Sequence, residues 1–282
     1  MKRNILYRSK NQSVSQKSIY LLIVSILSAN AIAAVDASKT VTANNQFLEK
    51  EGHQEIINWT GFYIGPNGGG IWGNPDTNIL PLPTPTQFLI NAATLTPSLS
   101  GGLFGGQIGY NRQMSVYRWL VLGIETDMNW SDLSGNTSQD AIGNGRLTGR
   151  VYKNAFSTHQ RTKWFGTLRP RIGFLAREYL LMYGTGGLAY GRVNENANSD
   201  YRPIGTQQYL AANNATLTGW TAGGGAELAF SQHWSAKVEY LYYDLGSTST
   251  TANPFITNPP FQTQYTWDNT AQLVRFGVNL HC

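Results

Sequence analysis

Hydrophobic residues recur at every second position in two blocks between Gly219 and Gly246. One face of the second half of this stretch is mainly aromatic and aliphatic, and it comprises Trp234, Ala236, Val238, Tyr240 and Tyr242. A repeat of two residues is the repeat of a β-strand. The first half alternates in the same way, and only a few residues separate the halves, so the pattern predicts an antiparallel hairpin.

The polar face of this hairpin carries small residues and single charges, such as Lys237 and Glu239. The apolar face carries aromatic residues near the strand ends. A strand that has lipid on one side and a crowded polar lumen on the other shows this distribution.

Seven further stretches extend the pattern along the chain. The eight predicted strands cover residues 59–73, 101–113, 119–130, 161–174, 179–193, 215–230, 234–245 and 265–280. Each is long enough to cross a bilayer at a tilt, which takes ~9–11 residues. Pro66 and Pro170 fall inside two of them. Because proline has no N–H for the ladder, we expect a β-bulge at each.

The connections between these strands alternate between long and short. The long ones cover residues 74–100, 131–160, 194–214 and 246–264, and the short ones 114–118, 175–178 and 231–233. Long loops outside and tight periplasmic turns are typical of outer-membrane barrels. The fold prediction is therefore all-β: an eight-stranded antiparallel transmembrane β-barrel with both ends in the periplasm.

Four stretches resemble one known family. They are HWSAKVEYLYYDLG from His233, NWTGFYIGPNGGGIWG from Asn58, KWFGTLRPRIGF from Lys163 and LLMYGTGGLAYGRV from Leu180. The resemblance, which spans roughly residues 59–280, is to the small outer-membrane β-barrels of alphaproteobacteria. These are porin-like surface antigens, and some are described as haemin-binding. The resemblance implies a barrel in the outer membrane of a Gram-negative bacterium, inserted by the outer-membrane assembly machinery.

The N-terminal segment resembles a secretion signal rather than part of the fold. Residues 1–17 contain five basic residues and no acid, an apolar run covers 19–27, and small residues follow. We predict a signal peptide at 1–33, a periplasmic lead segment at 34–57 and a barrel domain at 58–282. A membrane anchor or an amphipathic arm is the alternative for the first segment.

This assignment changes the meaning of the net charge of +5. The segment 1–33 holds five of the twenty-one basic residues, which leaves sixteen against sixteen acidic residues in the rest of the chain. A neutral mature protein gives no reason to expect a nucleic-acid partner. The single cysteine, Cys282, excludes an intrachain disulfide and a cysteine metal cluster, and we predict no metal site.

Inward-facing positions of the predicted strands carry four acids and four bases. They are Glu125, Asp127, Arg169, Arg171, Glu227, Lys237, Glu239 and Arg275. An eight-stranded barrel is just wide enough for its own side chains to fill it. A wide ion pore would show one dominant sign of charge. We therefore predict that these residues pair across a filled lumen.

Aromatic residues near the predicted strand ends are expected to form girdles at the two membrane interfaces. This set comprises Trp59, Phe62, Trp72, Trp119, Trp130, Trp164, Tyr190, Trp220, Trp234, Tyr240, Tyr242 and Trp267.

The second long loop is rich in basic residues. It has a candidate haemin site, with His159 as axial ligand and Arg150, Lys153 and Arg161 on the propionates. The resemblance adds support because the family includes haemin binders. The alternative is a solvated loop whose bases contact lipopolysaccharide phosphates. Ser157 beside His159 is the candidate for catalysis, and we expect no enzyme activity.

The function predicted from these patterns is a non-enzymatic outer-membrane barrel with an envelope-structural, surface-exposed role. Its expected partners are outer-membrane lipid and lipopolysaccharide. Two alternatives stay open: porin-like passive diffusion of small solutes, and surface haemin binding. No cofactor other than haemin is expected.

Overall fold

A computed structural model describes residues 57–82, 92–144, 151–201, 207–253 and 262–282. The predicted signal peptide and the lead segment lie outside these ranges, except for Ile57. The regular structure of the described residues is entirely β-strand. Within them, no helix has the length and the apolar character to cross a membrane.

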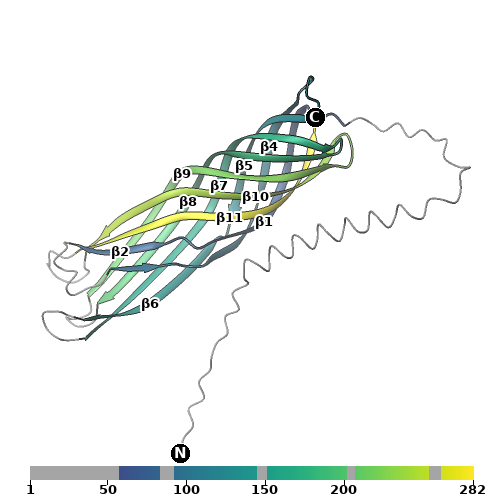
Figure 1. Ribbon diagram of the computed structural model, residues 1–282. Helices are drawn as coiled ribbons and strands as arrows, with labels where there is room; N and C mark the ends of the chain where they lie inside the picture. The colour runs from purple at the N-terminus through teal and green to yellow at the C-terminus, as the bar shows by residue number, and fades with distance from the viewer. Residues whose placement is uncertain (1–56, 83–91, 145–150, 202–206, 254–261) are drawn as a thin grey trace, which may run out of the picture. The chain divides into compact units, whose positions relative to one another are not determined.

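Eight long strands pair in antiparallel order around a closed ring (Figure 1). In ring order they are β1 (Gly61–Gly73), β4 (Leu99–Gln113), β5 (Leu120–Ser131), β7 (Val151–Arg177), β8 (Leu180–Tyr201), β9 (Gln207–Ala229), β10 (Trp234–Ala252) and β11 (Gln262–His281). The last strand closes on the first, with a register that runs from Tyr63↔His281 to Trp72↔Gln272. The predicted eight-stranded barrel is confirmed.

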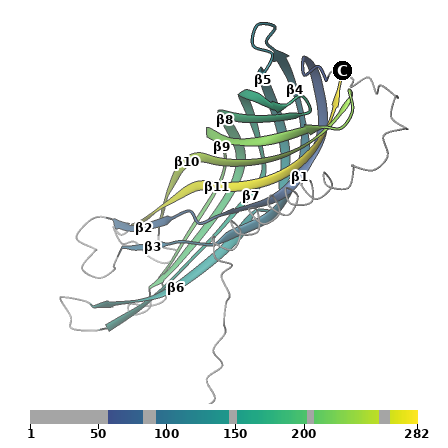
Figure 2. The ribbon, with the colours of Figure 1, turned by 45° about the vertical axis from the view of Figure 1, so that its right-hand side comes forward.

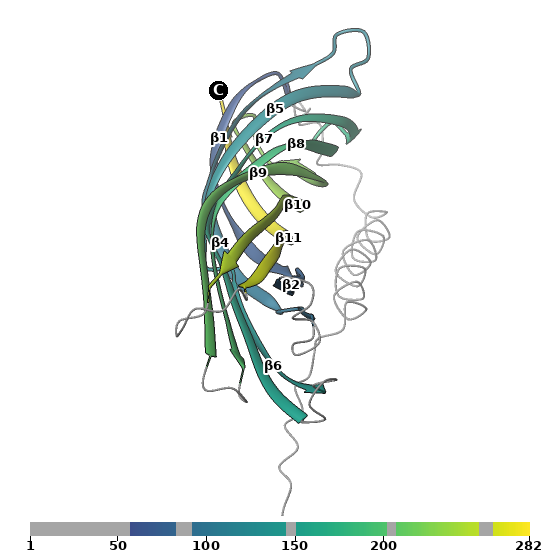
Figure 3. The same cartoon turned by 90° about the vertical axis from the view of Figure 1, so that its left-hand side faces the viewer.

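Short turns connect the strands at one end of the ring. At the other end the strands extend much further along the barrel axis. At the short end, the backbone N–H of His281 donates to the carbonyl of His233, and that of Cys282 donates to Phe62. The C-terminus thus lies beside the tight turns. At the other end the strands continue well past the predicted boundaries (Figures 2 and 3). We call this part, which comprises the described residues of 74–98, 132–162, 194–217 and 246–269, the distal extension.

The prediction of four long irregular loops is wrong for most of their length. Strands β8 and β9 stay paired in one register from Leu180↔Leu228 to Tyr201↔Gln207. Three extra strands lie in the first and second predicted loops: β2 (Thr77–Leu82), β3 (Ala93–Leu95) and β6 (Ser134–Asn144). β2 adds to β11 and β3, and β6 adds along β7.

The predicted bulges at the two prolines are also wrong. Pro66 pairs with Gly106 and Pro170 with Ile124, each within an unshifted register. Pairing is interrupted only on the other side of each strand, where Pro66 and Pro170 have no ladder partner in β11 and β8. Thr185 donates its hydroxyl to the carbonyl of Pro170 at 2.8 Å. The barrel accommodates a missing N–H without inserting a residue.

Glycines on the inner face make room for aromatic side chains. A Cβ at Gly109 would lie 2.4 Å from Cζ of Tyr63, and one at Gly225 would lie 2.8 Å from the Tyr183 hydroxyl. Because the barrel is narrow, a large side chain on one strand requires a small residue opposite it.

Outward positions between the short turns and the distal extension form an apolar belt that includes Phe62, Phe104, Trp130, Leu188, Trp220 and Phe276, all more than half exposed. The predicted girdle is wrong at two positions. Trp59 is 1% exposed and Trp267 is fully buried, so both lie inside. The indole N–H of Trp59 donates to the Glu178 carbonyl at 2.9 Å.

The interior is built in layers along the barrel axis. Next to the short turns is an apolar cluster around Trp59, Val121 and Leu181. The charged residues form the next layer. Beyond it lies a large apolar cluster around Phe165, Leu241 and Leu273, and the distal extension holds a further cluster around Tyr265 and Trp267.

Candidate functional site

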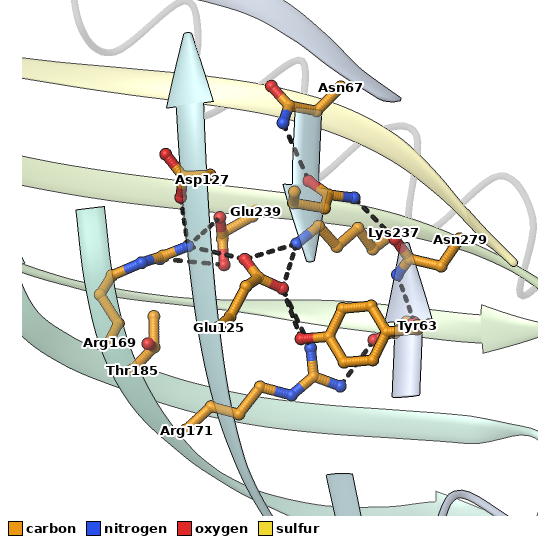
Figure 4. Close-up of polar contacts among 12 residues, drawn as sticks. Tyr63, Asn67, Glu125, Asp127, Arg169, Arg171, Thr185, Lys237, Glu239 and Asn279 are labelled. Carbon is orange, nitrogen blue, oxygen red and sulfur yellow. Dashed lines mark hydrogen bonds and ion pairs between the residues drawn. The ribbon is translucent and has the colours of Figure 1, made fainter. Parts of the chain in front are cut away.

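The charged layer of the lumen brings together all eight residues that the sequence pattern predicted. They project inward from β5, β7, β9, β10 and β11, and none is more than 3% exposed. Figure 4 shows how several of them converge on one another. They face inward because each occupies the phase opposite to the lipid-facing residues of its strand.

Glu125 on β5 lies at the centre of this layer. Its carboxylate accepts hydrogen bonds from Lys237 Nζ at 2.7 and 2.8 Å and from Arg169 Nη2 at 2.8 Å. The hydroxyl of Tyr63 donates to it at 2.7 Å, and Arg171 approaches to 3.5 Å. Arg275 of β11 approaches to 3.4 Å, so one carboxylate links five strands of the ring.

A second group surrounds Asp127 and Glu239. Arg275 Nη2 lies 2.8 Å from Asp127 and 2.6 Å from Glu239. Arg169 reaches the same two carboxylates at 3.0 and 3.2 Å. Each arginine thus bridges two acids, and the group spans strands β5, β7, β10 and β11.

The third group lies toward the short turns, where Arg171 Nη2 pairs with Glu227 at 2.8 Å. The Arg171 guanidinium also lies 5.0 Å from the Tyr63 ring centre and 4.7 Å from that of Tyr183. Cation–π contacts of this kind strengthen when water is excluded. His281 Nε2 lies 3.5 Å from Glu227 at the edge of the group.

Neutral polar residues extend the network, and the sequence interpretation missed them. Asn67 donates to Gln107 at 2.9 Å, Gln107 donates to Asn279 at 2.7 Å, and Asn279 donates to Glu227 at 2.7 Å. Three of these residues are inward-facing amides on strands β1, β4 and β11. Each occupies an inward-facing position of the alternating pattern, and this is the signal that could have identified them.

The charged layer is electrically balanced. It contains equal numbers of acids and bases, and each of the four acids lies within ion-pair distance of at least one arginine. A buried ion pair contributes little more to the stability of the fold than apolar residues of similar size. Removing one partner, however, leaves a buried charge without a countercharge, which destabilises the fold. The arrangement therefore favours one fixed geometry, in which all four acids of the layer are buried.

The haemin candidates are not brought into one described site. His159 and Arg161 share the exposed outer face of β7, where His159 lies between Asn136 of β6 and Asn196 of β8. Arg150 lies outside the described residues, and of Lys153 only the backbone, within β7, is described.

The Ser157–His159 stretch alternates between the two faces of the sheet. Thr158 points inward and accepts a hydrogen bond from the Trp267 indole at 3.1 Å. Ser157 and His159 point to the other face. In the part of the chain that the structure describes, no group of three or more His, Cys, Asp or Glu is placed to hold a metal ion.

Comparison with known families decides the classification. The family model for the outer membrane protein beta-barrel domain matches residues 52–278. The chain belongs to this family. It is an outer-membrane β-barrel of the alphaproteobacterial surface-antigen type, as its relatives show.

One relative is the 31 kDa outer-membrane immunogenic protein of Brucella melitensis. It is 34% identical over 233 residues, which cover 82% of this chain and 88% of the relative. The 22 kDa outer membrane protein of Rhizobium leguminosarum is 28% identical over 148 residues, or 51% of this chain and 54% of that protein. Both are named as outer-membrane proteins, so membership and location agree.

Among solved structures, this outer-membrane barrel is similar to the outer membrane protein OprG from Pseudomonas aeruginosa. The two are 14% identical, with a TM-score of 0.40, over 80% of this chain and 99% of that one. The outer membrane protease OmpT from Escherichia coli is 7% identical, with a TM-score of 0.37, over 80% and 98% of the two chains.

Proposed function

We propose that this protein is a non-enzymatic, filled barrel that serves the structure of the envelope and displays a rigid surface at the cell exterior. The observation that carries the proposal is the interior, in which a balanced charged layer lies between apolar clusters. Both kinds of layer are built from buried side chains of several strands.

The interior argues against porin-like diffusion as the main role. A solute that follows the axis meets Trp59 and Leu181, then the ion-paired layer, then Phe165 and Leu241. An ion in such a path loses its hydration, which costs several kcal/mol per charge after relaxation. A pore that compensates an ion for its lost hydration has a ring of charges of one sign, whereas this layer has positive and negative charges in equal number.

The distal extension suits a surface role. Its outward positions are small and polar on several strands, for example Asn196 on β8, Ser249 on β10 and Gln262 on β11. Since long connections of outer-membrane barrels face the exterior, we assign this end to the cell surface. The Brucella relative is named an immunogenic protein, which supports surface display here.

Lipid and lipopolysaccharide are the proposed partners of the outer surface. The exposed Arg161 and Lys163 lie on β7 next to Trp164, an aromatic residue of the lipid-facing side. Cations just beyond an aromatic girdle are placed to bind phosphate groups.

Planar-bilayer recording of the purified, refolded monomer tests the proposal. A filled barrel predicts little steady conductance, while a parallel reconstitution of a known porin gives large steps under the same conditions. Reproducible, stable channels from the pure monomer would contradict the filled interior and favour the porin alternative.

A further inference from the structure

Glu195 on β8 is the acid that the charged layer does not explain. It is fully buried inside the distal extension. Each of the four acids of the charged layer pairs with at least one arginine, but Glu195 has no basic partner within ion-pair distance among the described residues. A buried carboxylate without a countercharge is costly.

Three neutral donors hold this carboxylate in place. Asn269 Nδ2 donates to Oε1 at 2.9 Å, while Asn213 Nδ2 at 2.9 Å and Thr248 Oγ1 at 2.5 Å donate to Oε2. They come from β9, β10 and β11, and Asn213 is the direct cross-strand neighbour of Glu195 on β9. The two carboxylate oxygens together accept these three hydrogen bonds. The donors orient the charge but do not neutralise it.

Gln160 on β7 provides an independent observation at the same place. It is the direct cross-strand neighbour of Glu195 and is 3% exposed. Neither its Oε1 nor its Nε2 has a hydrogen-bond partner in the described part of the protein. Buried amide groups are almost always satisfied, so both atoms of this amide are available to a small species bound beside Glu195.

A small cavity connects the two residues. Its wall includes Gln160, Thr162, Glu195, Tyr243 and Asn269, and its volume, about 10 Å³ for the centre of a water-sized sphere, suits a single small occupant. Arg161 also lines the cavity, but its side chain is exposed and forms no ion pair with Glu195. The rest of the wall is mainly apolar and includes Pro75, Leu99, Leu133, Val193 and Leu245, so the oxygen ligands come from Glu195, Gln160 and the neutral polar residues beside them.

We propose that Glu195 and Gln160 bind one small hard cation inside the distal extension. Carboxylate and amide oxygens are the ligands that Ca²⁺ prefers, and a site with few charged ligands binds weakly, with Kd values of about 10⁻⁴–10⁻³ M in extracellular modules. The cation neutralises Glu195 and joins β7 to the strands whose side chains already hold the carboxylate. The site stabilises the distal extension in the ionic medium outside the cell.

Terbium luminescence tests this site, because Tyr243 in the cavity wall can transfer excitation energy to bound Tb³⁺, a hard cation that substitutes for Ca²⁺. The refolded wild-type barrel is expected to give saturable Tb³⁺ emission that Ca²⁺ competes away. Glu195→Gln should weaken Tb³⁺ affinity about tenfold or more, since it removes the one carboxylate. Gln160→Leu should weaken it about threefold or more. Asp268→Asn, which changes an acid directed outward on β11, should leave it unchanged.

A second readout covers monovalent cations and the folding of the variants. Ca²⁺ or Na⁺ should raise the Tm of the wild-type barrel, and this rise should be absent in Glu195→Gln. If that variant does not fold, the loss of Tb³⁺ affinity in Gln160→Leu decides. Emission that is equal in wild type and both variants, or a wild type with neither emission nor a cation-dependent Tm, would overturn the proposal and leave water as the occupant.

Discussion

The barrel near the short turns and its distal extension are built from the same strands but have opposite polarity. In the first region, exposed side chains such as Leu188 and Phe276 are apolar, while buried ones such as Arg169 and Glu239 are charged. In the second region the outer face is polar and the interior contains Tyr265 and Trp267. The first is the pattern of a protein in lipid, and the second is that of a protein in water.

The inversion occurs within single strands. On β11, the apolar positions near the short turns are even-numbered and face outward, from Val274 to Val278, whereas Tyr265 and Trp267 are odd-numbered and face inward. The strand keeps its geometry while the hydrophobic phase shifts by one residue. The position of this shift marks the point where the environment changes from lipid to water.

Removing one member of the charged layer should have the largest effect. Arg169→Met leaves Glu125, Asp127 and Glu239 short of a cation, and breaking a buried pair costs ~3–5 kcal/mol. Denaturant unfolding of the refolded barrel measures the loss. The matched control is Arg118→Met in an exposed turn, for which we expect a change within about 0.5 kcal/mol. Equal effects from the two variants would show that the layer does not hold the barrel together.

The interior of the extension should respond as an apolar core. Ile79 is 1% exposed and Leu80, its neighbour on β2, is 37% exposed. Ile79→Ala should cost ~2–5 kcal/mol, because it empties part of a packed cluster. Leu80→Ala is the control and should cost under ~1 kcal/mol. Hydrogen exchange of β2 and β11 amides measures the change locally, and the reverse ranking would mean that the strand faces the other way.

A smaller effect is expected from the polar contacts inside the extension. The Tyr265 hydroxyl donates to Ser199 Oγ at 2.6 Å within a buried cluster. Tyr265→Phe should cost ~0.5–1.5 kcal/mol, the net value of one such hydrogen bond. Tyr179→Phe, at a half-exposed position in a short turn, is the control. If Tyr265→Phe leaves the free energy of unfolding unchanged, water replaces the lost contact.

The surface histidine should matter least for stability, and it tests the haemin hypothesis. If His159 is an axial ligand, His159→Ala should lower haemin binding well below that of His233→Ala, while neither variant changes the Tm. Haemin titration followed by absorbance measures this. Equal haemin binding by the two variants would show that His159 is not an axial ligand. Lipopolysaccharide would then be the proposed ligand of the basic face of β7.

The sequence predicted the ring and the charged layer because both follow from one alternating phase. Arg169 and Glu239 were identified since each lies opposite to lipid-facing neighbours. The distal strands were missed because the hydrophobic phase reverses there, and a reversed phase resembles the end of a strand. For the same reason Trp267 was assigned to the lipid side, although it is buried.

Other differences depend on contacts that one strand alone does not show. Glu195 lies in a segment that was predicted to be a loop, so its burial and its pairing with Gln160 were not foreseeable. The prolines were expected to need bulges, but the neighbouring strand keeps its register and only one side of the pairing is lost. The burial of Glu195 and the unshifted register at the prolines both depend on how neighbouring strands pair in the closed ring.

The change from a lipid to a water environment can be measured at two positions on the outer face of a single strand. Leu188 and Asn196 both point outward on β8, which keeps a constant register with β9. In a Cys282→Ser background, spin labels at Leu188→Cys and Asn196→Cys should differ in accessibility in reconstituted bilayers. The label at 188 should collide mainly with oxygen, which concentrates in lipid, and the label at 196 mainly with a water-soluble nickel complex. The same preference at both positions would contradict the account.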